Sequence, residues 1–226
     1  MTDSGMKIAS VPTLRRLASY YHCLKQWEGA GRDTVSCTHI AEQLMLDPTQ
    51  VRKDIEATGL VGKPKVGYSV HSLIGAIEKF LGWDRLSDAF LVGAGNLGAA
   101  LLGYTRFSRY GLNIVAAFDI APAKIGGRIQ GREVLPLDKL SNLARRMHVA
   151  VGIITTPAEV AQTVANLMVA GGIRAIWNFA PVILDVPKDV IIENVSLASS
   201  LAVLSSRLAR RREADAREAL PSKENP

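Results

Sequence analysis

Apolar residues recur at helical spacing through most of the first eighty positions of the chain. The spacing predicts an amphipathic helix over residues 12–28, where Leu14, Leu17, Tyr21 and Leu24 share one face. Shorter helices are predicted over residues 37–46 and 71–82, the second ended by a glycine. The N-terminal part of the chain is therefore expected to be a small helical domain.

The stretch "DPTQVRKDIEATG" carries start and stop signals for a further helix. Asp47 is a favourable N-cap, Pro48 suits the first turn, Gln50 stands at the third position of a capping box, and Gly59 is a favourable stop. Val51 and Ile55, four positions apart, would face the core, which leaves outside Thr49, Gln50, Arg52, Lys53 and Glu56. A helix, a tight turn and a capped second helix predict a helix-turn-helix.

The outer face of this helix has side chains that suit DNA. Glutamine and arginine read base edges in the major groove, and lysine contacts phosphate. The following "VGKPKVGYSV" predicts a small basic hairpin, like the wing of a winged helix. The residues expected to bind DNA are Thr49, Gln50, Arg52, Lys53, Lys63 and Lys65. The alternative is a helical cap whose charged face is only solvated.

After residue 83 the pattern changes to short apolar runs that alternate with amphipathic segments. The runs cover residues 89–93, 113–120, 148–156 and 173–179, and helices are predicted between the later ones. Such alternation predicts an α/β fold with a parallel, doubly wound, Rossmann-type sheet. We expect a DNA-binding domain over residues 1–82 and a Rossmann domain over 83–195.

A dinucleotide signature opens the second domain. Gly93, Gly95 and Gly98 have GxGxxG spacing between an apolar run and a helix, so Ala94, Asn96 and Leu97 belong to the same turn. Asp119 follows about twenty residues later, where an acid bonds the ribose hydroxyls and favours NAD(H) over NADP(H). Two later turns at predicted strand ends are candidate walls of the site, or plain turns: Thr155, Thr156 and Pro157, then Asn178 and Phe179.

Bulk properties narrow the class of protein. The chain has 226 residues, 48% of them hydrophobic, a net charge of +6 and two cysteines. No apolar run of about eighteen residues indicates a membrane span, and no secretory signal is recognisable at the start. We expect a cytoplasmic protein without disulfides or a metal site. The charge alone does not identify a DNA-binding protein, since residues 1–80 carry ten basic and eight acidic side chains.

The nucleotide pattern is complete, whereas a catalytic pattern is missing. His148 is interpreted as structural at the start of a buried strand, and the other histidines lie in the first domain. No Tyr-x-x-x-Lys motif supplies a proton donor for hydride transfer. This favours a sensor without catalytic residues. An NAD-dependent oxidoreductase with an N-terminal cap or dimerisation domain stays open, as does a DNA-binding protein that holds nucleotide only structurally.

The C-terminal segment predicts one more helix, over residues 196–213, before a disordered tail over 214–226. Leu197, Leu201, Leu204 and Leu208 form a narrow apolar seam on it. A narrow seam suits packing against a second chain, as a DNA-binding homodimer requires. Packing against its own domain is the alternative.

The chain resembles the Rex family of redox-sensing repressors from about residue 11 to residue 208. The resemblance rests on the order of "QVRKD", "VGY", "GAGNLG", "FDIAPAKIG" and "NFAPVILDVPKDVIIENV". It implies a homodimer that exchanges its last helices and binds an inverted-repeat operator in double-stranded DNA. It also implies release by NADH and repression of fermentation and respiration genes.

The resemblance also assigns roles to single residues. Lys124 joins the NAD site, and Arg16 and Tyr104 match residues that couple nucleotide state to dimer geometry. Two stretches depart from the family. A "LSYFG"-like stretch is replaced by "IEATG", so we expect a different operator. The Asp and Phe that open the exchanged helix, the Phe entering the nicotinamide pocket, are replaced by Ser196 and Leu197, so we expect a differently built NADH response.

Overall fold

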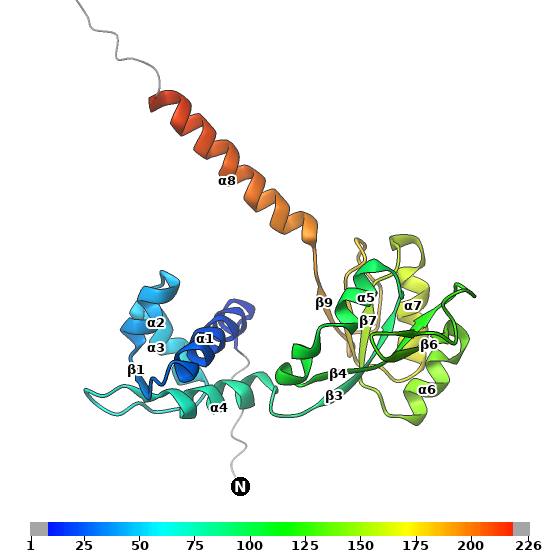
Figure 1. Cartoon of the computed structure of the whole chain (residues 1–226), viewed down its shortest axis with the longest axis horizontal. Coiled ribbons are helices and arrows are strands. Elements are labelled where there is room, and N and C mark those ends of the chain that lie inside the picture. Colours follow the sequence, from blue (N-terminus) through cyan, green and yellow to red (C-terminus); the bar gives the residue numbers. More distant parts are fainter. Residues whose placement is uncertain (1–8, 219–226) are drawn as a thin grey trace, which may run out of the picture. The chain divides into compact units, whose positions relative to one another are not determined.

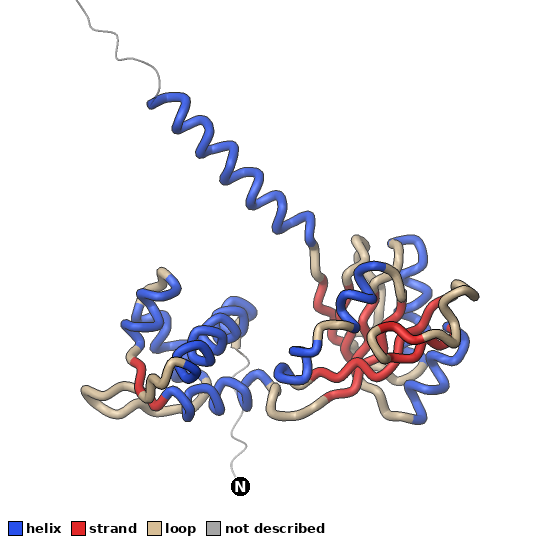
Figure 2. The backbone as a smooth tube through the Cα atoms, in the orientation of Figure 1, coloured by secondary structure: helices blue, strands red, loops and turns tan. Residues whose placement is uncertain are grey.

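The computed structural model describes residues 9–218, and its backbone contacts divide the chain into two units. The first unit runs to Leu86 and includes Arg106–Asn113, and the second comprises Ser87–Thr105 and the chain from Ile114 onward. The sequence predicts a boundary near residue 83 but gives no sign that the chain returns to the first unit. Figures 1 and 2 show the elements of both units.

The first unit is a small helical bundle with a two-stranded sheet. Leu17, Tyr20, Ile55 and Leu73 from three helices are fully buried in its core. The strands β1 and β2 pair antiparallel, Thr34 with Ser69 and Val35 with Tyr68. The elements are α1 (Val11–Gly29), β1 (Thr34–Val35), α2 (Cys37–Leu44), α3 (Pro48–Ala57), β2 (Tyr68–Ser69) and α4 (Val70–Leu81), with the 3-10 helix η1 (Thr105–Tyr110) at the boundary.

The ends of α3 follow the predicted signals, except for the capping box. The Asp47 carboxylate accepts the N–H of Thr49 at 2.8 Å and that of Gln50 at 3.1 Å, and Gly59 after the helix has φ 79°. The predicted capping box is wrong, because the Gln50 amide donates to Asp54 Oδ1 at 3.0 Å instead. A capping box needs the Gln50 side-chain oxygen to accept the Asp47 N–H, but the bond to the buried Asp54, one turn further along, turns the Gln50 amide away from that position.

A capping box does occur at the start of α2, where the sequence pattern gave no expectation. Ser36 Oγ accepts the His39 N–H at 3.2 Å, and His39 Nδ1 accepts the Ser36 N–H at 3.3 Å. The imidazole thus takes the place that glutamate or glutamine usually fills.

The predicted wing forms as a short loop next to β2. Lys63 and Gly67 face each other across an antiparallel bridge, with N–H to O distances of 2.7 and 2.9 Å. Lys65 at the tip has φ 62°, a left-handed conformation that is uncommon outside glycine, asparagine and aspartate. The loop therefore presents both lysines on a closed turn.

The second unit is built on a seven-stranded sheet, as the alternation predicts. Its strand order is β5-β6-β4-β3-β7-β8-β9, and the pairs β6–β4, β3–β7, β7–β8 and β8–β9 are parallel. The antiparallel edge hairpin of β5 and β6 was not predicted, because its strands are short and polar. The elements are β3 (Ser87–Val92), α5 (Asn96–Leu102), β4 (Leu112–Asp119), β5 (Arg128–Ile129), β6 (Arg132–Pro136), η2 (Leu137–Lys139), α6 (Leu140–Arg146), β7 (Val151–Ile154), α7 (Ala158–Ala170), β8 (Ala175–Asn178) and β9 (Ile191–Asn194).

The core of this unit packs the sheet against α6 and α7. Phe90 and Phe118 on neighbouring strands meet edge to face with ring centroids 4.9 Å apart, and Met168 of α7 is fully buried. His148 does not begin a buried strand as predicted. It is exposed, with φ 54°, and follows the end of α6, three residues before β7.

The last helix, α8 (Leu197–Glu218), is uninterrupted (Figure 1) and begins after Ser196, which caps it. Ser196 Oγ accepts the Ser199 N–H at 3.1 Å. The helix includes residues 214–218, which the sequence assigned to a tail, and residues 219–226 lie outside the described residues. Among the described residues, no helix has both the length and the apolar character that a membrane span requires.

Candidate functional site

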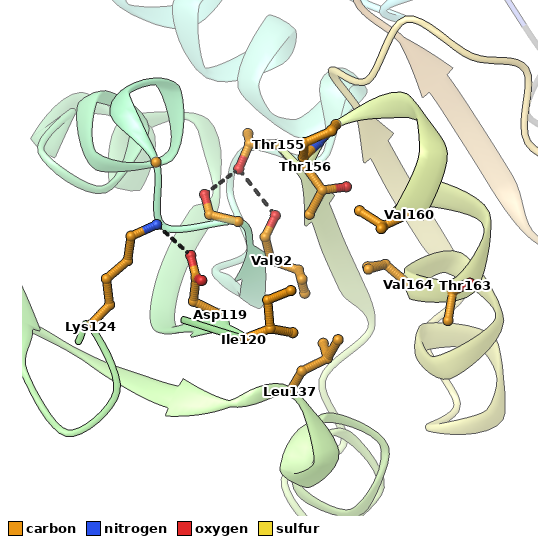
Figure 3. Close-up of a pocket in the computed structure, with 13 residues that line it drawn as sticks. Val92, Asp119, Ile120, Lys124, Leu137, Thr155, Thr156, Val160, Thr163 and Val164 are labelled. Carbon is orange, nitrogen blue, oxygen red and sulfur yellow. Dashed lines mark hydrogen bonds and ion pairs between the residues drawn. The ribbon is translucent and has the colours of Figure 1, made fainter. Parts of the chain in front are cut away.

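A cavity of about 540 Å³ opens where β3, β4 and β7 end (Figure 3). The chain leaves β3 toward β4 on one side, and it returns to β7 on the other side. Parallel sheets bind ligands at such a reversal of strand order. The cavity is lined by Val92, Gly93, Gly95, Asp119, Ile120, Lys124, Leu137, Thr155, Thr156, Pro157, Val160, Thr163 and Val164.

Each of the three positions in the turn favours glycine for its own physical reason. Gly93 has φ 105°, and a Cβ there would lie 2.8 Å from the Thr155 carbonyl. A Cβ on Gly98 would collide with the carbonyl oxygen of Gly93. A Cβ on Gly95 would meet nothing within 4 Å. The protein fold itself requires the first and third glycines, whereas Gly95 leaves room inside the cavity for a ligand.

The helix after this turn starts without a side-chain cap. Gly95 occupies the N-cap of α5, so no side chain accepts the first N–H groups of Asn96–Leu102. Such groups can bind an anion such as a pyrophosphate. Ala94 is buried and Leu97 is partly exposed, and neither side chain lines the cavity.

Asp119 is held at the end of β4 by three donors. Its Oδ2 accepts the Ala94 N–H and Lys124 Nζ, both at 2.9 Å, and its Oδ1 accepts the Ala121 N–H at 2.9 Å. Burial alone would raise the pKa of Asp119, but these hydrogen bonds outweigh it and the pKa is lowered. The carboxylate therefore stays charged in the cavity, beside an ammonium group that can donate to the same ligand (Figure 3).

Two threonines from the end of β7 line the opposite side. Thr155 Oγ1 donates to the carbonyl oxygens of Val92 and Gly93, at 3.1 and 2.8 Å, and so fixes the glycine turn (Figure 3). Thr156 Oγ1 is buried and has no hydrogen-bond partner among the described residues. A buried hydroxyl without a partner is rare, and Thr156 lines the cavity, so its hydroxyl is a candidate hydrogen-bond partner for a bound ligand.

The remaining wall is apolar and was missed from the sequence. Ile120 follows Asp119 directly, Leu137 lies in η2, and Val160 and Val164 lie on α7. For Ile120 and Leu137 the available signal was their position directly after a strand end, whereas Val160 and Val164 lie within α7 and had no such signal. A polar end and an apolar slot together fit a nucleoside.

Several predicted site residues lie outside this cavity. The fully buried Asn178 amide donates to the carbonyls of Ala180 and Val182 and to Asn194 Oδ1, at 3.2, 3.0 and 2.9 Å, so the structure gives it a role in fixing the turn after β8. Phe179 packs on Trp177, with ring centroids 4.8 Å apart. Tyr104 and Leu197 are 43% and 69% exposed and do not line the cavity of their own chain.

The first unit has the expected cationic face. Thr49, Arg52 and Lys53 are exposed on α3, whereas Gln50 is half-buried and bonded to Asp54. A groove of about 590 Å³ lies between α3, the start of α2 and the wing, and its cationic lining residues are Arg52, Lys63 and Lys65. Arg16 pairs with Asp54 beneath this face, with Nε to Oδ2 at 2.6 Å.

The leucine seam of α8 is open to solvent. Leu197, Leu201, Leu204 and Leu208 are 49–69% exposed, so the seam does not pack into the core of its own chain. No cluster of three metal-ligating side chains occurs in the part of the chain that the structure describes.

Comparison with known proteins covers both units. Residues 8–55 match the family described as putative DNA-binding protein N-terminus, and residues 84–182 match the CoA binding domain family. A redox-sensing transcriptional repressor Rex from Treponema denticola is 46% identical over 198 residues, which are 88% of this chain and 94% of that protein. The Rex of Desulforamulus reducens is 43% identical over 206 residues, which are 90% and 98% of the two chains.

Solved structures agree with these relatives. The repressor RSP in complex with β-NAD⁺ and operator DNA superimposes with a TM-score of 0.86 at 34% identity, covering 96% of this chain and all of that one. RSP in complex with β-NADH superimposes with a TM-score of 0.84 at 34% identity, covering 92% of this chain and 98% of that one. With both units, their order and nearly the full length matched, the chain belongs to the Rex family of redox-sensing transcriptional repressors.

Proposed function

We propose that this chain is a homodimeric repressor that binds operator DNA and is released when NADH replaces NAD⁺. The observation that carries the proposal is a nucleotide cavity with an open Gly95 and a charged Asp119, in one chain with a winged helix-turn-helix. The RSP complexes with β-NAD⁺ plus operator DNA and with β-NADH support both ligand classes for a relative.

The cavity residues favour NAD(H) in a defined orientation. The pyrophosphate would lie over Gly95 and the start of α5, and the adenosine ribose would lie at Asp119 and Lys124. A 2′-phosphate would meet the Asp119 carboxylate, which disfavours NADP(H). The apolar slot of Ile120, Leu137 and Val160 would take the adenine.

DNA would be bound through α3 and the wing. Thr49, Arg52 and Lys53 would enter the major groove, and Lys63 and Lys65 would contact the backbone or the minor groove. In this assignment Gln50 supports Asp54 from its half-buried position and contributes its second amide hydrogen and carbonyl oxygen to the interface.

The two sites would communicate through the geometry of a dimer. The exposed leucine seam of α8 supplies the contact with a second copy, in which the helices are exchanged. Arg16, Tyr104, Ser196 and Leu197 are the proposed switch residues. Binding of NADH would favour dimers whose half-site spacing does not fit DNA, and operator DNA would weaken NADH binding by the same factor.

We also propose that the protein is a regulator and not an oxidoreductase. The described residues that line the cavity include no histidine, tyrosine or cysteine, and their only charged groups, Asp119 and Lys124, neutralise each other. Hydride transfer to a carbonyl substrate would need a proton donor within hydrogen-bond reach of the reacting atom.

Fluorescence anisotropy with labelled genomic promoter fragments tests the function. At one fixed salt concentration, tight binding with NAD⁺ and release by NADH is expected, with NADPH as the control nucleotide. DNA affinity that is the same with NAD⁺, with NADH and without nucleotide would contradict redox sensing. It would favour a DNA-binding protein that holds the nucleotide only for structural reasons. NADH oxidation that depends on a substrate, and that persists after deletion of residues 1–80, would favour the alternative that the protein is an oxidoreductase.

A further inference from the structure

The DNA-facing surface of the recognition helix carries one carboxylate, that of Glu56. Thr49, Arg52, Lys53 and Glu56 are spaced three, one and three positions apart, so they form one stripe along α3, and all four are exposed. Arg52 and Glu56 line the same groove beside the wing. The four side chains of this stripe are thus exposed, whereas Gln50 is half-buried.

The other acids of α3 and its cap have structural roles, whereas Glu56 has none. Asp47 caps the helix, and Asp54 is buried in an ion pair with Arg16. Within the described residues the Glu56 carboxylate makes neither a hydrogen bond nor an ion pair. Glu56 and Tyr68 line the same groove, and the pKa of Tyr68 is raised by burial first and then by Cys37 and the charge of Glu56.

An unpaired carboxylate on this face has few favourable contacts with DNA. It can only accept hydrogen bonds, and it is repelled by phosphates and by the acceptor atoms of guanine and thymine. The donors in the major groove are the N4 amino group of cytosine and the N6 amino group of adenine, and glutamate pairs with the former. The carboxylate therefore restricts which base pair can lie beneath it.

We propose that Glu56 accepts the N4 amino group of a cytosine in each operator half-site and thereby sets the sequence preference of this chain. Arg52 lies one turn before it, about 6 Å along the helix, and base pairs are stacked about 3.4 Å apart. If Arg52 reads a guanine, the cytosine lies within about two base pairs of it. The inference rests on the proposed DNA binding and adds its base specificity.

Selection from a randomised duplex library tests this with full-length protein in the NAD⁺ form. The variants are Glu56→Ala and Glu56→Gln, and Glu133→Ala is the control because it removes the same charge from an exposed site on β6 of the second unit. Competition titrations at fixed salt then compare the selected site with versions that carry each other base at the cytosine position.

Wild type and Glu133→Ala are expected to prefer cytosine about 5- to 100-fold over guanine or thymine. Glu56→Ala should lose this preference and bind the substituted sites at least as tightly as wild type does, and Glu56→Gln should shift toward adenine. If wild type and Glu56→Ala select the same sequence and discriminate against the other bases equally, the inference about Glu56 is overturned while the proposed DNA binding stands. A wild type that selects no sequence would overturn the proposed DNA binding itself.

Discussion

Arg16 on α1 and Asp54 on α3, the proposed recognition helix, form a two-point ion pair. Nε to Oδ2 measures 2.6 Å and Nη2 to Oδ1 measures 2.8 Å. Tyr20 adds a hydrogen bond to Oδ2 at 2.7 Å and Gln50 one to Oδ1 at 3.0 Å, so each carboxylate oxygen accepts two. The recognition helix is thereby anchored on the first helix through a carboxylate that is 2% exposed. A displacement of Arg16 would act directly on the DNA-binding element.

Replacing Asp54 with asparagine is expected to destabilise the first unit. The change leaves Arg16 without a charge partner. The cost should be about 3 kcal/mol, at the low end for a broken buried ion pair, because 25% of the Arg16 side chain is exposed. Urea unfolding measures it, with the exposed Asp33→Asn as the control. An equal free energy of unfolding in both variants would contradict the anchoring role.

The same ion pair predicts a dependence of stability on acid. Burial alone would raise the pKa of Asp54, but the hydrogen bonds from Arg16 and Tyr20 outweigh it and leave the pKa lowered. The unfolded pKa is about 3.9, so the contribution is complete above that pH and is lost as pH falls through the lower folded value. Urea midpoints between about pH 6 and 3 should converge for wild type and Asp54→Asn at the acid end. A constant difference would count against the assignment.

The glycines of the nucleotide turn allow folding and binding to be separated. Gly98→Ala should lower the melting temperature by about 5 °C or more, because the new Cβ collides with the Gly93 carbonyl. Gly95→Ala should melt like wild type, because its Cβ meets nothing within 4 Å, yet it should bind NADH at least about tenfold more weakly. Calorimetry measures both properties. Unchanged NADH affinity in Gly95→Ala would place the pyrophosphate elsewhere.

Thr156 provides a second test of the cavity. Its buried hydroxyl has no partner in the described part of the chain, so Thr156→Val should raise the stability of the free protein by about 1 kcal/mol. The same change should weaken NADH binding if the hydroxyl bonds the nucleotide. Thr163→Val, on the exposed part of the cavity wall, is the control. Stronger NADH binding in Thr156→Val would show that the hydroxyl is no contact.

Sequence patterns predicted the elements well where one local signal sufficed. Asp47 fixes a helix start through its side-chain hydrogen bonds, Gly59 and Gly82 mark helix ends through their positive φ angles, and the glycine turn indicates where the cavity lies. Contacts between positions far apart in the chain have no such local signal in the sequence. The bond that removes Gln50 from the capping box depends on a carboxylate whose burial only the packed helices create.

Among the residues that line the cavity, too, only those with a local sequence signal were predicted. Asp119 was found because its place after a strand has a known role, whereas Leu137 and Val160 come from segments whose apolar residues serve the core as well. The return of residues 106–113 to the first unit was also missed. Tyr110 packs there on Trp83, with ring centroids 4.9 Å apart, and no periodic pattern encodes such a pair.

Ser196 and Leu197, at the start of α8, stand where the resemblance to the family implies an aspartate and a phenylalanine, and the structure makes this expected departure testable. Ser196 caps the helix, and aspartate caps equally well, so Ser196→Asp should leave the helix intact. With Leu197→Phe, the double variant would gain what the resemblance implies at these positions: a carboxylate for a charge-assisted bond to Arg16 or Tyr104, and an aromatic ring for the proposed nicotinamide pocket. We expect release from operator DNA at lower NADH concentration, with NAD⁺ affinity little changed. The control is Leu201→Phe alone, which enlarges the seam one turn later. An unchanged release curve in the double variant would show that the two residues at the start of α8 do not set the NADH response of this protein.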